Sequence, residues 1–221
     1  MSKIRLKFSK TGMGKYISHL DLLRTFTRAI HRAGLPVRYS QGFNPHQLIT
    51  FSLPLALGVT SETEFVDIDF EDGTDKCEVV EKLNINLPPD IRILHASVPE
   101  CKANDIVSAR YTVTLGLQEA VSAEKMQEFF DKAEIPAVKK TKRGEKEINL
   151  REYIKDYKLM NLCEKSAEFE VILSAGGETN IKPDILVAKL CEFLDDCADE
   201  SVEIHRTEIF YEKGEKTVTF C

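Results

Sequence analysis

The chain repeats one order of predicted strands and helices in its two halves, and this repetition limits the folds that it can adopt. Alternating apolar residues predict strands at residues 4–8 and 64–70, and a capped apolar repeat predicts a helix at residues 18–33 between them. A second series of this kind begins at residue 111, without residue-level identity to the first. Strand–helix–strand units joined by antiparallel pairs favour an α+β fold with helices on one face of each sheet.

This element order predicts two ferredoxin-like modules of the βαββ type, packed side by side. A polar and weakly patterned stretch at residues 99–108 marks the boundary between them. We therefore expect residues 1–103 to form an N-terminal ferredoxin-like module and residues 104–221 to form a C-terminal one. A chain of 221 residues, with 43% hydrophobic and 30% charged residues, is long enough to bury the cores of such modules.

The basic residues are concentrated at the N-terminal end of the chain. Residues 1–50 contain nine lysines and arginines but one acidic residue, Asp21, which gives this segment a net charge of +8. The whole chain has a net charge of −6, which leaves −14 for the remaining residues. Such asymmetry indicates a local anion-binding face. The alternative is a solvated surface whose charge is balanced by the acidic part of the chain.

The predicted helix at residues 18–33 presents arginines on one face. Arg24, Arg28 and Arg32 are four residues apart and follow one another along the helix, with His31 beside them. Arginine binds phosphate through a planar fork, so this row suits the phosphates of a nucleic-acid backbone. The alternative is a solvated helix face that pairs with acidic residues. A separate stripe is expected to face the core: Leu20, Leu23, Phe26, Ile30 and Ala33.

A dense turn follows this helix at residues 40–46, with the sequence Ser-Gln-Gly-Phe-Asn-Pro-His. Gly42 permits a positive φ, and the proline after Asn44 restricts that residue to extended or turn geometry. Aromatic and polar side chains on such a stiff loop can stack on a base and hydrogen-bond its edge. The alternative is a structural turn in which Phe43 packs into the core. The predicted nucleic-acid or anion-binding set is Arg24, Arg28, Arg32, His31, Tyr39, Gln41, Phe43, Asn44 and His46.

Two histidines are candidates for acid–base chemistry. His19 lies on the first turn of the predicted helix and His46 closes the loop, so a pair would form only if the fold brings them together. The six cysteines form no C-x-x-C pair and no zinc-finger spacing, so we expect no metal site and no iron–sulfur cluster held by this chain. Without a signal-peptide core or an apolar run near the ~20 residues of a membrane helix, we expect a cytoplasmic protein.

Two long segments carry a family resemblance. They are KYISHLDLLRTFTRAIHRAGLPVRYSQGFNPH at residues 15–46 and FSLPLALGVTSETEFVDIDF at residues 51–70, with weaker support from INLREYI and HRTEIFYE. These segments resemble the DUF2344 family of bacterial proteins, also called radical SAM-linked or radical SAM-associated proteins. The family usually continues Pro-His-Pro-Lys after the turn, whereas this chain has Pro45-His46-Gln47-Leu48. That departure is expected to loosen the turn and to remove one anion contact.

The resemblance implies a partner enzyme. Members of the family are encoded beside, or fused to, a radical SAM protein, so the iron–sulfur cluster and S-adenosylmethionine are expected on that partner and not on this chain. The predicted pair of ferredoxin-like modules is also similar to the fold of the RAMP proteins of CRISPR systems, which bind and sometimes cut RNA. This second likeness is one of fold, which by itself does not define a function.

Three functional hypotheses of different classes fit these residues, and we rank them in the order given. The first is a non-catalytic accessory module that binds RNA or another phosphate-rich substrate and presents it to a radical SAM partner. The second is a metal-independent endoribonuclease of RAMP-like fold that uses His19 or His46 as a general acid or base. The third is a protein-docking subunit whose basic face meets an acidic patch on the partner, without nucleic acid.

Overall fold

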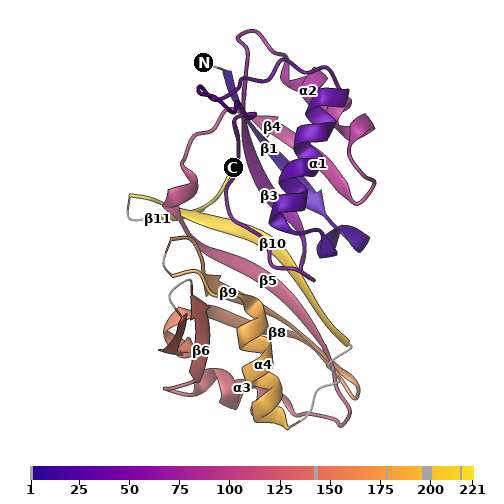
Figure 1. The fold of residues 1–221 in the computed structure, drawn as a ribbon. Coiled ribbons are helices and arrows are strands. Elements are labelled where there is room, and N and C mark those ends of the chain that lie inside the picture. The colour runs from indigo at the N-terminus through magenta and orange to yellow at the C-terminus, as the bar shows by residue number, and fades with distance from the viewer. Residues whose placement is uncertain (1, 142–143, 178, 196–200, 215) are drawn as a thin grey trace. The chain divides into compact units, whose positions relative to one another are not determined.

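The computed structural model describes residues 2–141, 144–177, 179–195, 201–214 and 216–221. The chain divides into two compact units, one formed by residues 1–106 with 211–221 and the other by residues 107–210. Both units combine strands and helices, which confirms the predicted α+β class (Figure 1). The C-terminal segment thus belongs to the first unit in space. The boundary expected between residues 103 and 104 stays a prediction about folding domains.

The first unit contains an antiparallel sheet with two helices packed on one face (Figure 1). Its strands are β1 (Ser2–Lys10), β2 (Ile49–Phe51), β3 (Thr60–Phe70) and β4 (Ile91–Ser97), in the order β4-β1-β3 with β2 paired to β3. Its helices are α1 (His19–Arg32) and α2 (Lys76–Asn86), and its 3₁₀ turns are η1 (Gly12–Tyr16) and η2 (Ala103–Asp105). Apolar side chains from both helices and from β1, β3 and β4 form its core.

The second unit has strands in the order β10-β5-β9-β8. They are β5 (Ile106–Gly116), β8 (Ile154–Cys163), β9 (Ser166–Ser174) and β10 (Val202–Lys213), the last of which runs on into the first unit. The helices are α3 (Ala123–Asp131) and α4 (Pro183–Leu194), with the 3₁₀ turn η3 (Leu150–Tyr153). Strands β6 (Pro136–Thr141) and β7 (Gly144–Asn149) form a separate two-stranded sheet, and β11 (Lys216–Thr219) pairs with β10.

Helix α1 begins and ends where its sequence signals predict. The Ser18 Oγ accepts a hydrogen bond from the backbone N–H of Asp21 at 3.2 Å, which caps the first turn. After the helix, Gly34 adopts a φ of +62°, a conformation that glycine enters without steric cost. The helix predicted at residues 18–33 is therefore confirmed.

The buried stripe of α1 differs from the predicted one. Leu20 is 62% exposed and Leu23 is half-buried, whereas α1 buries Leu22, Phe26, Ala29 and Ile30. The prediction was wrong for Leu20 because two neighbouring stripes of this helix both satisfy helical periodicity. The sheet selects one of them, since the ring of Phe26 packs edge-on against that of Phe8 on β1, with centroids 5.2 Å apart.

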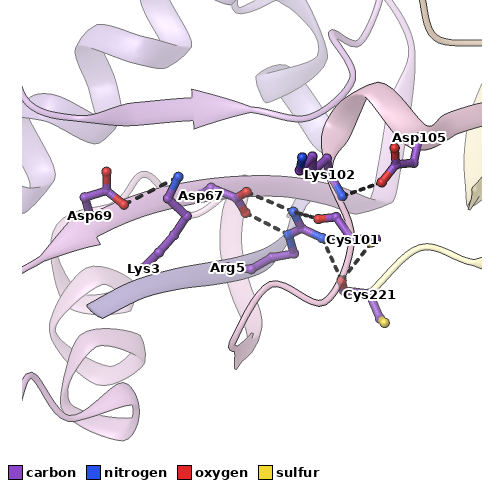
Figure 2. Close-up of polar contacts among 8 residues, drawn as sticks. All are labelled: Lys3, Arg5, Asp67, Asp69, Cys101, Lys102, Asp105 and Cys221. Atoms are coloured by element: carbon purple, nitrogen blue, oxygen red, sulfur yellow. Dashed lines mark hydrogen bonds and ion pairs between the residues drawn. The ribbon is translucent and has the colours of Figure 1, made fainter. Parts of the chain in front are cut away.

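Strand β1 carries a buried cation, Arg5, which is 1% exposed (Figure 2). Its Nε and Nη2 donate to the two carboxylate oxygens of Asp67 on β3, at 2.7 and 2.8 Å. Its Nη2 also donates to the carbonyl of Cys101 at 2.9 Å, and its Nη1 to the carbonyl of Cys221 at 2.8 Å. Arg5 alternates with the apolar residues Ile4 and Leu6 and so lies on the opposite side of the strand, but residues distant in sequence cover that side as well.

Electrostatic interactions stabilise the buried, charged side chain of Arg5. Burial lowers the pKa of Arg5, while the hydrogen bonds and charge of Asp67 raise it, and the pKa ends above its ordinary value. The aromatic ring of Phe220 adds a cation–π contact, with the guanidinium carbon 4.4 Å from the ring centroid. Arg5 therefore stays charged and binds together β1, β3 and two segments that follow them in the chain.

Replacing Arg5 by methionine is expected to lower the free energy of unfolding by about 3–5 kcal/mol, because Asp67 and two carbonyls lose their donor. Lys3→Met is the matched control on the same strand. Lys3 pairs with Asp69 at 3.6 Å but is half exposed, so its loss should cost less than about 1 kcal/mol. Urea unfolding of both variants measures the difference, and equal losses would contradict the role given to Arg5.

Candidate nucleic-acid interface

A surface groove of about 500 Å³ lies in the first unit between α1 and residues 39–49. Helix α1 forms one wall with Leu23, Thr27, Arg28, His31 and Arg32, and the other wall consists of Tyr39, Pro45, His46, Gln47 and Ile49. The arginines and histidines of this set are exposed, whereas Leu23 and Ile49 are half-buried and Gln47 is buried. Cationic groups therefore lie at the edge of the groove, and apolar side chains and one amide lie deeper.

The first arginine of the helix row, Arg24, lies outside the groove and has a partner of its own. Its Nη1 donates to Asp21 Oδ1 at 2.9 Å, and both side chains are exposed. The Ser18 hydroxyl donates to the other oxygen of Asp21 at 2.7 Å. These hydrogen bonds, that of Ser18 first, hold the pKa of Asp21 below its ordinary value. Asp21 therefore remains ionised and partly neutralises Arg24.

The other two arginines line the groove in different states. Arg32 donates from Nη2 to the backbone carbonyl of Asn86, which fixes one edge of its guanidinium group. Arg28 makes no hydrogen bond or ion pair with any described residue. Residues four apart on a helix are neighbours on its surface, so the two arginine side chains leave α1 at adjacent positions and line the same groove. The groove thus contains two adjacent cations that form no ion pair with a described carboxylate, although the charge of Asp21 also acts on Arg28.

The loop between Tyr39 and Gln47 is closed by hydrogen bonds between its ends. The N–H of Ser40 donates to the carbonyl of His46 at 2.8 Å, and the N–H of His46 donates to Ser40 Oγ at 3.1 Å. The same Oγ lies 2.9 Å from His46 Nδ1, which leaves Nε2 as the ring nitrogen open to a ligand. Gly42 adopts a φ of +124°, a backbone conformation that residues other than glycine rarely adopt.

Gln47 lies at the base of the groove and is 7% exposed. Its Nε2 is 3.4 Å from the carbonyl of Thr27 and 3.4 Å from the hydroxyl of Tyr39, and both distances are long for hydrogen bonds. Its Oε1 is buried and has no hydrogen-bond partner among the described residues. An unpaired buried polar atom costs about 1–3 kcal/mol, so this position is not optimised for stability.

The structure places the predicted binding residues in two groups. Those that line the groove are Arg28, His31, Arg32, Tyr39 and His46, and those that lie outside it are Arg24, Gln41, Phe43 and Asn44. Phe43 is fully exposed, so the alternative that it packs into the core is wrong. Sequence reasoning missed the deeper residues Leu23, Gln47 and Ile49 as parts of the site. A polar residue directly after the turn was a signal for Gln47, whereas the apolar pair gave none.

The two candidate catalytic histidines lie in different places. His19 lines a separate and much smaller pocket, where its ring packs edge-on against Phe51 with centroids 5.4 Å apart. That pocket shares no lining residue with the groove that contains His46. His31 lines the groove together with His46. It is twelve residues from His19 on α1, which corresponds to about 18 Å along the helix axis. The geometry therefore does not assemble His19 and His46 into an acid–base pair.

Metal-binding groups are dispersed over the part of the chain that the structure describes. No group of three or more histidine, cysteine, aspartate or glutamate side chains is arranged there to hold a metal ion. The free cysteines are Cys101, which is buried, and Cys77, Cys163 and Cys221, which are exposed. Within the described residues, each helix is too short or too polar to cross a membrane.

The fold and this site define an α+β protein with a cationic groove edged by an aromatic side chain. The family described as "Uncharacterized protein conserved in bacteria (DUF2344)" matches residues 3–183. The chain therefore belongs to the DUF2344 family, as the segments at residues 15–46 and 51–70 predict. Among curated proteins, none matches the sequence.

Solved structures are similar to this chain in fold. A chain in the crystal structure of a Cbf5-Nop10-Gar1 complex is 11% identical with a TM-score of 0.54, over 96% of this chain and 50% of that one. A chain of the archaeal box H/ACA sRNP Nop10-Cbf5 complex is 11% identical with a TM-score of 0.50, over 92% of this chain and 46% of that one. The protein thus spans about half the length of the solved chains it matches, and at this identity the likeness concerns the fold alone.

Replacing Gln47 by methionine is expected to change the free energy of unfolding by less than about 1 kcal/mol, because an unpartnered oxygen is lost together with two long hydrogen bonds. Asn84→Leu is the control, since both ends of the Asn84 amide are paired with Ile93, at 3.0 and 2.8 Å. That variant should lose about 1–3 kcal/mol. Chemical denaturation measures both, and a loss for Gln47→Met as large as that for Asn84→Leu would contradict this assignment.

Proposed function

We propose that this protein is a non-catalytic module that binds RNA, or another phosphate-rich ligand, and works with a radical SAM partner enzyme in the cytoplasm. The observation that carries ligand binding is the groove, which Arg28 and Arg32 line on one wall and Tyr39 lines on the other. The partner is proposed from the family resemblance, and any iron–sulfur cluster and S-adenosylmethionine would be held by that partner.

The charges in the groove support a phosphate ligand. Two guanidinium groups one helical turn apart repel each other, and an anion between them relieves this repulsion. Each arginine offers a planar pair of donors that matches two phosphate oxygens. The bond from Arg32 to the carbonyl of Asn86 holds one guanidinium in place, so less conformational entropy is lost when a phosphate binds.

The order of strands supports the proposal that both units are ferredoxin-like modules. In the first unit, β1-α1-β2-β3-α2-β4 folds with the strand order β4-β1-β3-β2, and in the second unit β10-β5-β9-β8 corresponds to it position by position. The hairpin of β6 and β7 is an insertion after α3. One solved neighbour is named as part of an sRNP, but that likeness is one of fold, so the RNA proposal depends on the groove.

The geometry of the groove bears differently on the two alternative functions, the endoribonuclease and the protein-docking subunit. An endoribonuclease would use His19 or His46 as a general acid or base. The two side chains line separate pockets, so each would act without the other, and His46 is the one that shares the groove with Arg28 and Arg32. A protein-docking role needs the same exposed cations as RNA binding does. Protein docking therefore becomes the preferred function if these arginines are found to bind a protein partner and not RNA.

The variant Arg28→Glu/Arg32→Glu, which removes both arginines of the groove, is expected to bind RNA at least about tenfold more weakly than the wild type and to reduce the salt dependence of binding by about two phosphate contacts. Lys155→Glu/Lys158→Glu is the matched control, with the same change of charge on exposed residues of β8 in the second unit. Filter binding to labelled RNA over a series of salt concentrations measures both.

Two other results of this experiment would redirect the proposal. If the double arginine variant binds RNA as tightly as the wild type, the groove is not the RNA-binding site. A wild-type protein that binds no RNA, but retains a protein partner that the double variant loses, would establish the docking role in its place.

A further inference from the structure

The groove combines a deep apolar surface with a cationic edge, and each of these suits a different part of one ligand. A free phosphate would pair with Arg28 and Arg32 but would leave the side chains of Leu23 and Ile49 uncovered. A purely apolar ligand would cover that surface but leave the two guanidinium groups unpaired. A volume of about 500 Å³ falls within the range of pockets that enclose a small organic molecule.

We infer that the groove takes one unpaired nucleotide of a single-stranded RNA, with its base against Tyr39 and its phosphate between Arg28 and Arg32. This inference rests on the proposed function and adds to it the form of the nucleic acid. The base is out of its stack, and the strand is unpaired where it enters the groove.

Three side chains fit the phosphate of such a nucleotide. Arg28 has its full set of donors available, since no described residue pairs with it. Arg32 retains the donors that do not contact Asn86. His46 is held through Nδ1 by Ser40, which leaves Nε2 open to a ligand, and Nε2 donates to a phosphate or ribose oxygen in the tautomer that carries its proton there. These donors come from both walls of the groove, which is the arrangement that encloses one phosphate group.

Two side chains fit the base. Tyr39 is 47% exposed and lines the groove, so it offers an aromatic side chain for stacking. The Oε1 atom of Gln47 is a buried acceptor without a partner among the described residues, and every nucleobase carries an N–H donor on its Watson–Crick edge. Both hydrogen bonds of Gln47 Nε2 are 3.4 Å long and easily exchanged. The inference requires that Tyr39 and Gln47 rotate when the nucleotide binds, so that this oxygen reaches the edge of the base.

A duplex does not supply these contacts. In duplex RNA the Watson–Crick edges are paired and the base faces are stacked within the helix. The duplex therefore offers phosphates, ribose hydroxyls and minor-groove base edges, but neither a free base face nor a free Watson–Crick edge. The apolar surface and the Gln47 amide then stay unused. A site of this kind therefore prefers single-stranded RNA, whereas a row of arginines alone binds both forms through their phosphates.

The test compares a short labelled single-stranded RNA of mixed sequence with the blunt duplex of the same sequence, at one fixed salt concentration. The wild type is expected to bind the single strand at least about tenfold more tightly than the duplex. Tyr39→Leu should lose about tenfold in affinity for the single strand and little for the duplex, while Tyr39→Phe, which keeps the ring, should bind like the wild type. Tyr16→Leu is the matched control, since Tyr16 is exposed in the same unit but lies outside the groove.

The outcomes separate the inference from the proposed function. If the wild type binds single strand and duplex equally, or Tyr39→Leu keeps its affinity for the single strand, the inference is overturned and RNA binding stands. If the wild type binds neither RNA, the proposed function fails and the inference fails with it. Circular dichroism confirms that Tyr39→Leu is folded. Gln47→Met gives a second readout, because a loss of single-strand affinity at unchanged stability is expected from a contact with the base.

Discussion

The buried guanidinium of Arg5 is the interaction on which the first unit depends. A cation that is 1% exposed is tolerated only when its donors are satisfied. Arg5 bonds to a carboxylate on β3 and to two carbonyls from residues that are 120 positions apart in the chain. Its pairing with Asp67 also agrees with the register of β1 on β3, in which Ile4 lies opposite Ile68 and Leu6 opposite Val66. A slip of one residue would expose those apolar pairs and separate the charges.

The position of the groove depends on how α1 packs against this sheet. Burial of Phe26 and Ile30 fixes the rotation of the helix, and this rotation places Arg28 and His31 at the edge of the groove. The facing wall is a loop whose two ends are tied by reciprocal hydrogen bonds between Ser40 and His46. Both walls are therefore ordered before a ligand arrives, which lowers the conformational entropy lost on binding.

Gln47 shows how stability and function differ at this site. Its amide is buried with the oxygen unpaired among the described residues, against the general rule that buried polar groups find partners. A local cost of this kind is expected where a residue contacts a ligand and not only its neighbours in the fold.

The sequence by itself determined the elements and the charge of the site. Alternation gave the strands, Ser18 and Gly34 gave the ends of α1, and the spacing of Arg24, Arg28 and Arg32 gave one cationic helix face, because these signals act within a few residues. Tertiary structure decided which leucines of α1 are buried, that Arg5 is enclosed, and that Arg28 and Tyr39 share a groove with Gln47 while Arg24 and Phe43 do not. These outcomes depend on contacts between residues far apart in the chain, and local periodicity carries no information about which distant segment covers a given face.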